Sequence, residues 1–164
     1  MNSSSFVKAD TRKGSKGWRV TYYREDGSGV TRVGGYRTWR NQNPGNIRSM
    51  GSFAKSHGAI GEAGGFAVFP SYESGRAATF SLLKTSKYQE RTLSQTIHSY
   101  SPKKDGNNPE RYQRLVHKWS GLDLKRKVKD LSAKELEKLV DAIERMEGYR
   151  EGIIIENPAT LPKW

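Results

Sequence analysis

The amino-acid sequence predicts an α+β fold that is mostly helical, with a small β element near the N-terminus. Residues 18–39 alternate bulky and polar side chains around a turn sequence, as a β-hairpin does. Residues 109–147 place apolar side chains at helical spacing between start and stop signals. The chain has 164 residues, and its four Trp, eight Tyr and five Phe supply apolar area for one folded domain over 17–164.

The N-terminal segment divides at about residue 17. Residues 1–16 are rich in Ser, Lys and Gly, so we expect a flexible tail or linker. From Trp18 the stretch WRVTYYRE is β-branched and aromatic, which favours a strand. The turn sequence DGSG follows at 26–29, and VTRVGGYRTW is predicted to return as the second strand of a hairpin.

The middle of the chain alternates loops and helices. Four glycines within eight residues surround Glu62 and favour a tight loop, which the strand-like run FAVF follows up to Pro70. Ser71 or Ser74 is expected to cap a helix over 73–88, and a further helix is expected over 91–99.

The last third of the chain carries the clearest helix signals. Asn108 followed by Pro109 marks a helix start, and an apolar stripe continues to Trp119. Ser132 and Glu135 have the spacing of a capping box for a second helix, and Gly148 is expected to end it.

The charge of the chain predicts a polyanionic partner. Its formal net charge is +12, from 29 Lys and Arg against 17 Asp and Glu. Residues 1–50 hold ten basic and three acidic side chains. Nucleic acid, an anionic membrane and an acidic cell wall all fit this charge. Long-range electrostatic attraction depends on the sign of the partner's charge and does not distinguish the chemical groups that carry it.

Several classes of function are disfavoured by composition. No segment approaches the ~18–20 apolar residues of a membrane span, and the N-terminus lacks the apolar core of a signal peptide. The absence of cysteine excludes disulfide and thiolate chemistry. The three histidines stand far apart without metal-ligand spacing, so we expect no metal site and no cofactor.

Two carboxylates outside the helix faces are candidates for acid–base chemistry. Glu62 lies among small and apolar residues, where partial burial would favour the protonated form that a general acid needs; an exposed loop glutamate is the alternative. Glu73 lies near a predicted helix start. The alternative for Glu73 is an ordinary first-turn residue, because the helix dipole favours a carboxylate there. The acidic residues at 130–147 lie among lysines at helical spacing and are interpreted as solvated faces.

The stretch RNQNPGNIR at 40–48 and the aromatic residues before it are candidates for binding. The amides of Asn41, Asn43 and Asn46 fit either sugar hydroxyl and acetamido groups or their own turn backbone. Tyr36 and Trp39 fit either stacking on a sugar ring or base, or packing in the core.

Four motifs in order resemble a known family: WRNQNPGNIR, FAKSHGAIGEAGGFAVFPSYESGRAA, YSPKKDGNNPERYQRLV and AIERMEGYREGII. The chain looks like the lysozyme-like peptidoglycan hydrolase (muramidase) domain of type VI secretion effectors and related phage and polymorphic-toxin proteins. In that family WRNNNPGNI, GAIG, FAVFP and a late EG recur. The resemblance covers about residues 15–155. It departs at Gln42, where the family usually has Asn, and in the spacing of YSPKKDGNN.

The resemblance implies a lysozyme-like fold that cuts the glycan strand between N-acetylmuramic acid and N-acetylglucosamine. Glu62 would protonate the glycosidic oxygen, while Glu73 would hold a water or stabilise the oxocarbenium-like transition state. The side chains implied as substrate contacts are Trp39, Arg40, Asn41, Asn43, Asn46 and Tyr72.

The resemblance also implies an antibacterial effector domain. Such a domain acts in the periplasm or cell wall of a target cell, after delivery by secretion machinery or within a larger protein, and needs an immunity partner. One rival is a nucleic-acid binder or nuclease toxin, which basic arms with interleaved aromatic residues also fit, although no nucleic-acid motif is present. The other rival is a cell-wall-binding module without catalysis.

Overall fold

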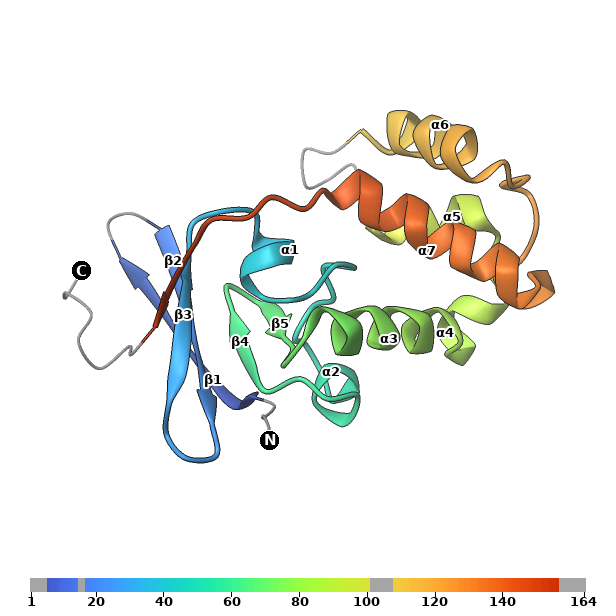
Figure 1. The fold of residues 1–164 in the computed structure, drawn as a ribbon. Coiled ribbons are helices and arrows are strands. Elements are labelled where there is room, and N and C mark those ends of the chain that lie inside the picture. The colour runs from blue at the N-terminus through green and yellow to red at the C-terminus, as the bar shows by residue number, and fades with distance from the viewer. Residues whose placement is uncertain (1–5, 15–16, 101–107, 157–164) are drawn as a thin grey trace. The chain divides into compact units, whose positions relative to one another are not determined.

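The structure is a computed structural model that describes residues 6–14, 17–100 and 108–156. It confirms an α+β fold (Figure 1). The chain divides into two compact units: Met1–Ala78 with Glu147–Trp164, and Thr79–Met146. Each unit has its own apolar cluster, which is the physical reason for the division.

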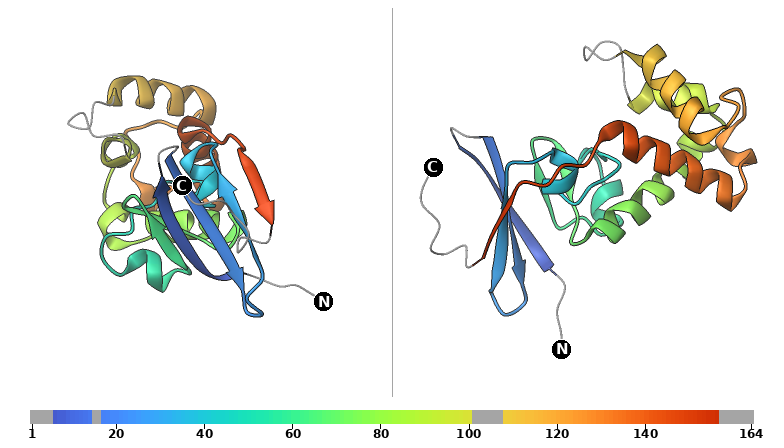
Figure 2. Two further views of the ribbon diagram at one scale, coloured as in Figure 1. Left: turned by 90° about the vertical axis from the view of Figure 1, so that its left-hand side faces the viewer. Right: turned by 45° about the horizontal axis from the view of Figure 1, so that its top comes forward.

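The first unit contains a four-stranded antiparallel sheet in the order β1-β2-β3-β6. The strands are β1 (Phe6–Gly14), β2 (Gly17–Arg24), β3 (Gly29–Val33) and β6 (Ile153–Glu156). Figure 2 shows β6, in red, beside β3. The predicted hairpin is confirmed as β2 and β3, and the sheet has one further strand on each side of it.

Two expectations for this region differ from the structure. Residues 6–14 form strand β1 instead of a tail, although 1–5 and 15–16 lie outside the described residues. As an edge strand, β1 buries only Ala9, so its sequence carries little apolar signal. The strand expected to continue to Trp39 ends at Val33, and after the Gly34–Gly35 pair the chain forms the short helix α1 (Arg37–Arg40).

Three short elements complete the first unit before helix α3 begins. They are α2 (Phe53–Ser56) and the hairpin of β4 (Gly61–Ala63) and β5 (Phe66–Val68), which confirms the strand expected at FAVF. The apolar cluster of this unit joins the sheet to the hairpin through Ala9, Val20, Tyr22, Val30, Ala63 and Val68.

The second unit is helical. Its helices are the C-terminal part of α3 (Tyr72–Leu83), α4 (Ser86–Gln89), α5 (Leu93–Tyr100), α6 (Pro109–Ser120), the 3-10 helix η2 (Val128–Asp130) and α7 (Ala133–Glu147). The helix expected over 73–88 is interrupted after Leu83, where the Thr85 hydroxyl donates to the Leu82 carbonyl oxygen at 2.7 Å and competes with helical pairing. Helices α5, α6 and α7 confirm the sequence prediction, whereas η2 was not predicted. The segment YSPKKDGNN lies largely outside the described residues.

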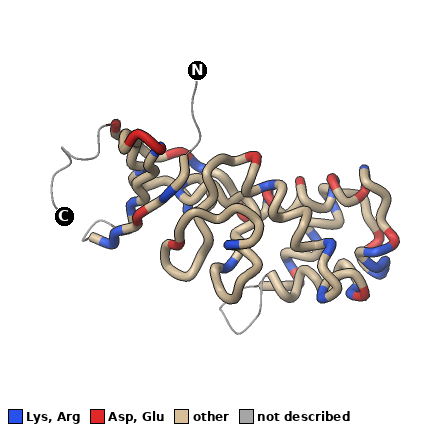
Figure 3. Tube along the Cα trace, turned by 90° about the horizontal axis from the view of Figure 1, so that it is seen from below, with Lys and Arg blue, Asp and Glu red and all other residues tan. Residues whose placement is uncertain are grey.

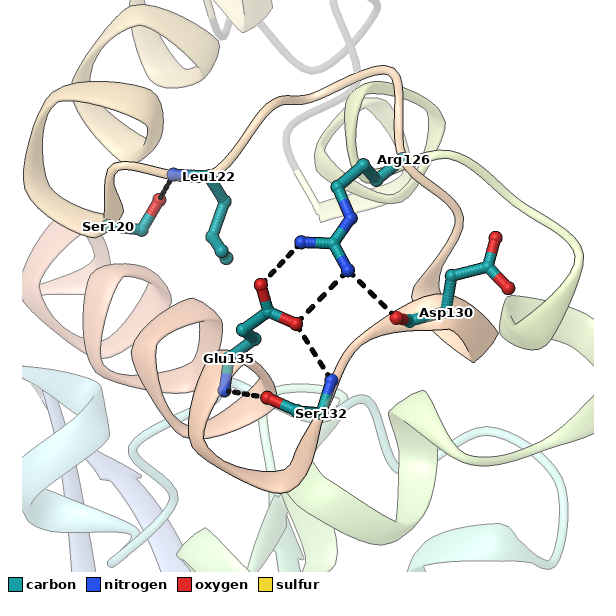
Figure 4. A network of polar contacts seen from close by, with 6 residues as sticks. All are labelled: Ser120, Leu122, Arg126, Asp130, Ser132 and Glu135. Atoms are coloured by element: carbon teal, nitrogen blue, oxygen red, sulfur yellow. Dashed lines mark hydrogen bonds and ion pairs between the residues drawn. The ribbon is translucent and has the colours of Figure 1, made fainter.

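Side chains cap both long helices of this unit as predicted. Asn108 accepts a hydrogen bond from the Arg111 backbone N–H at 3.0 Å. At α7 the Ser132 N–H donates to Glu135 Oε1 at 2.9 Å, and the Glu135 N–H donates to Ser132 Oγ at 3.2 Å. Figure 4 shows that Arg126 extends this capping box by contacting the Glu135 carboxylate and the Asp130 carbonyl oxygen.

Charged residues are spread along both units. Lys and Arg recur between Asp and Glu throughout the described chain (Figure 3). Within these residues, no helix has the length and apolar character needed to span a membrane.

Candidate functional site

The loop at residues 41–49 is anchored by two buried asparagines. Asn43 accepts from the Ile47 N–H at 2.9 Å and donates through Nδ2 to the carbonyl oxygens of Ile47 and Ala67, both at 2.9 Å. Asn41 Nδ2 donates to the Ala67 carbonyl oxygen at 3.3 Å. Both side chains are 0% exposed, so they attach the loop to strand β5.

Four of the sequence-predicted substrate contacts have partners within the protein, and for Asn43 and Trp39 these are the structural alternatives given above. The Asn43 amide bonds within its own turn through Ile47, as a turn former does, and the amides of Asn41 and Asn43 both donate to Ala67 of β5. Trp39 is buried with the Arg32 guanidinium 4.7 Å from its ring centroid, which makes it a core residue and not a stacking surface. Arg40 donates to the carbonyl oxygens of Gly34 and Gly35 at 3.1 and 3.2 Å, which fixes the turn after β3.

Gln42, the position at which the sequence departs from the resembled family, also has a structural role. Its Nε2 donates to the carbonyl oxygens of Phe69 and Pro70, and its Oε1 accepts from Arg32 Nη2 at 3.2 Å. The longer Gln side chain thus connects the sheet to the segment before α3.

Asn46 is the predicted amide that reaches a carboxyl group. It is half-buried, and its Nδ2 donates to Oε1 of Glu147 at 2.8 Å. Its Oδ1 accepts from Arg37 Nε at 3.1 Å, which fixes the orientation of the amide. The backbone of Asn46 has φ +49°, a left-handed conformation that Asn tolerates better than most residues.

Glu147 is the functional candidate that the sequence analysis missed. It was assigned with the solvated helix faces, but it is the half-buried last residue of α7. The chain beyond it is held against α1, since Thr38 Oγ1 donates to the Gly148 carbonyl oxygen and the Tyr36 N–H donates to the Arg150 carbonyl oxygen. The late EG of the fourth motif was the available signal, but only its Gly148 was given a structural role, as a helix stop.

Gly148 permits this connection. Its φ is +82°, and a Cβ atom at this position would lie 2.8 Å from Cε2 of Tyr36. The Tyr36 ring therefore packs directly on the backbone that follows Glu147.

Glu62 lies on the outer side of the β4–β5 hairpin. The expected partial burial is not found: Glu62 is exposed, because Ala63 takes the inward position on this short strand. Its Oε2 accepts from the Gly65 N–H at 2.9 Å and from Ser49 Oγ at 3.4 Å. These contacts fix the carboxylate above the hairpin turn.

Glu73 is exposed in the first turn of α3. This position agrees with the alternative given for it above, a carboxylate favoured by the helix dipole.

Tyr36 packs on Gly148, and Tyr149 follows Gly148 in the chain. Tyr36 and Tyr149 are each 47% exposed, and Tyr149 meets the half-buried Tyr72 edge to face with ring centroids 5.8 Å apart. The sequence indicated Tyr36 and Tyr72 but not Tyr149. Exposed aromatic rings beside a fixed carboxyl group are suited to stacking on a sugar.

The described residues contain no group of three His, Asp or Glu side chains arranged to hold a metal ion. Comparison of the chain with protein-family models and with curated proteins gives no match. The lysozyme-like resemblance thus rests on the four sequence motifs.

Proposed function

We propose that the protein is a lysozyme-like glycosidase that cleaves the peptidoglycan glycan strand between N-acetylmuramic acid and N-acetylglucosamine. The four motifs support this proposal, and so does the net charge of +12, which suits the anionic groups of a bacterial cell wall.

One structural observation carries the proposal: two carboxyl groups from distant parts of the chain contact the two ends of one four-residue segment. Asn46 binds Glu147, and Ser49 binds Glu62. The Cα atoms of Asn46 and Ser49 can be at most about 11 Å apart, even in a fully extended chain. Both carboxyl groups thus contact one short loop, and a glycosidase that uses this pair must bring them to the ~5–9.5 Å separation of catalytic carboxyl groups.

The surroundings of the two carboxyl groups favour different roles. The Asn46 amide and the nearby Arg37 guanidinium favour the ionised form of Glu147, which suits the group that stabilises the oxocarbenium-like transition state or attacks it. Glu147 takes the place that the sequence analysis gave to Glu73.

Glu62 keeps the role of proton donor in this proposal. Since it is exposed without substrate, the bound glycan must supply the desolvation that favours its protonated form. Gly65, on the hairpin turn beside Glu62, borders open space, because a Cβ atom built there would meet nothing within 4 Å.

The experiment is digestion of purified sacculi, with release of soluble muropeptides measured by chromatography. The wild-type protein should release muropeptides, while Glu62→Gln and Glu147→Gln should each reduce release by at least a hundredfold, about 2.7 kcal/mol of barrier. Glu137→Gln is the matched control, because it removes the same charge from an exposed position of α7.

A parallel DNA gel shift separates the rival functions. Sacculus binding without muropeptide release would indicate a cell-wall-binding module, and a DNA shift without release would indicate a nucleic-acid binder. Near-normal release by Glu147→Gln would reject the role of Glu147. In the proposed setting the protein acts in the wall of a target cell, which requires secretion machinery for delivery and an immunity protein in the producing cell.

A further inference from the structure

The backbone on both sides of Tyr149 is held in place. The Gly148 carbonyl oxygen accepts a hydrogen bond from Thr38 Oγ1, and the Arg150 carbonyl oxygen accepts one from the Tyr36 N–H at 2.9 Å. Both donors lie in α1 or at the residue before it, and all of these residues belong to the first unit. The position of Tyr149 relative to α1 is therefore fixed.

The ring of Tyr149 is oriented by a second aromatic residue. It meets the Tyr72 ring edge to face, with an interplanar angle of 81° and centroids 5.8 Å apart. A planar ring has two faces, and Tyr72 contacts at most one of them. Tyr149 is nevertheless 47% exposed. An accessible side chain that is already ordered loses little conformational entropy when it binds a ligand.

We propose that Tyr149, supported by Tyr72, is a stacking residue for an N-acetylglucosamine ring of the glycan. This inference rests on the proposed function, which supplies the glycan. The apolar C–H face of a pyranose can bury itself on an aromatic ring while its hydroxyl and acetamido groups stay at the edge. The Cα atoms of Glu147 and Tyr149 can be at most about 7 Å apart, so the stacking residue and the candidate carboxyl group belong to one short segment.

The charges nearby in the sequence favour a neutral sugar over a nucleobase as the stacked ligand. Three carboxylates and one guanidinium lie within two residues of Tyr72 or Tyr149 along the chain: Glu73, Glu147, Glu151 and Arg150. This balance disfavours the phosphate that accompanies every base of a nucleic acid. N-acetylglucosamine carries no charge that these carboxylates would repel.

The test is a calorimetric titration of the full chain with chitotriose, a neutral trimer of N-acetylglucosamine. The wild-type protein should bind it, and Tyr149→Ala should bind it at least about tenfold more weakly. Tyr149→Phe should keep the affinity within about twofold of wild type, because it retains the ring. Tyr149→Leu should bind as weakly as Tyr149→Ala, since Leu supplies apolar bulk for packing on Tyr72 without a planar face.

Tyr23→Ala is the matched control. It removes a half-buried tyrosine ring from β2 and should keep the wild-type affinity for chitotriose. No binding of chitotriose by the wild-type protein, wild-type affinity in Tyr149→Ala, or equal losses in Tyr23→Ala and Tyr149→Ala would overturn the inference. A loss in Tyr149→Ala that affects only a single-stranded DNA oligonucleotide would also overturn it.

Release of muropeptides from sacculi separates this inference from the proposed function. Wild-type chitotriose affinity in Tyr149→Ala, together with release by the wild-type protein, would remove the stacking role and leave the glycosidase proposal standing. Chitotriose binding that depends on Tyr149, without release from sacculi, would support the stacking role and refute the glycosidase proposal.

Discussion

The side-chain amide of Asn46 donates a hydrogen bond to Oε1 of Glu147 at 2.8 Å, although the two residues are 101 positions apart in the chain. Arg37 completes the arrangement by donating to the other end of the same amide at 3.1 Å. Because both atoms of the amide are engaged, its orientation is fixed, and so is the face of the carboxyl group that it contacts. The asparagine-rich loop is thus a support for one carboxyl group in addition to a turn.

Two replacements of Asn46 should distinguish its contact with the Glu147 carboxyl group from its contribution to the stability of the fold. Asn46→Gly retains the φ of +49° without strain but removes both side-chain hydrogen bonds. We expect muropeptide release to fall at least tenfold, about 1.4 kcal/mol of barrier, with a stable fold. Asn46→Ala should lower release similarly and also reduce stability by about 1–2 kcal/mol, because Ala is strained in this conformation. Wild-type release by Asn46→Gly would show that the contact with Glu147 has no functional role.

The helical parts of the fold could be predicted because their signals are local. Asn108 and Pro109 start α6, and Ser132 with Glu135 starts α7, through side chains that act within one turn. Strand β1 could not be recognised in the same way. Its stability comes from pairing with β2 along its whole length, and its exposed face carries charged residues that are typical of a linker.

The candidate site was only partly predictable for a related reason. The motif order indicated the asparagine-rich loop, but sequence periodicity could not tell which amide faces backbone and which faces a carboxyl group. Glu147 has the spacing of a solvated residue, and only the tertiary contact with Asn46 distinguishes it from Glu137 or Glu144 of the same helix. Glu62 has apolar neighbours in sequence, yet the alternation of its short strand turns it outward.

Gly75 should be required for the close approach of α3 to the asparagine-rich loop. A Cβ atom there would lie 2.2 Å from the Gln42 carbonyl oxygen and 2.9 Å from Cδ of Pro44. Gly75→Ala gains up to about 1 kcal/mol of helix propensity, but the backbone clash should outweigh this and give a net loss of about 1–3 kcal/mol in the free energy of unfolding.

Urea denaturation of Gly75→Ala measures this loss. The comparison variant is Ala77→Gly, at an exposed position of the same helix, which should lose about 0.5–1 kcal/mol from propensity alone. An increase in the stability of Gly75→Ala would contradict the close approach of helix and loop.

Adsorption of the protein to sacculi should weaken as salt is added. The net charge of +12 acts through a field whose range falls from about 10 Å at 0.1 M salt to about 3 Å at 1 M. We expect the fraction that sediments with sacculi to drop steeply over this interval. A bound fraction that does not change with salt would exclude electrostatic attraction as the basis of wall binding.

The capping box of α7 should make stability depend on pH in the acid range. The hydrogen bonds from Arg126, followed by that from the Ser132 N–H, lower the pKa of Glu135 from its ordinary value of 4.5 to about 2. Because the pKa is depressed in the folded state, this contribution is fully present above about pH 4.5 and is lost as the pH falls toward about 2. The melting temperature of Glu135→Gln should therefore lie furthest below wild type near neutral pH, and the difference should shrink between these two pH values. Glu137→Gln, at an exposed position of the same helix, should show no comparable trend. If the difference for Glu135→Gln stayed constant from about pH 6 to pH 2, the carboxylate would not be held in its ionised form by Arg126 and Ser132.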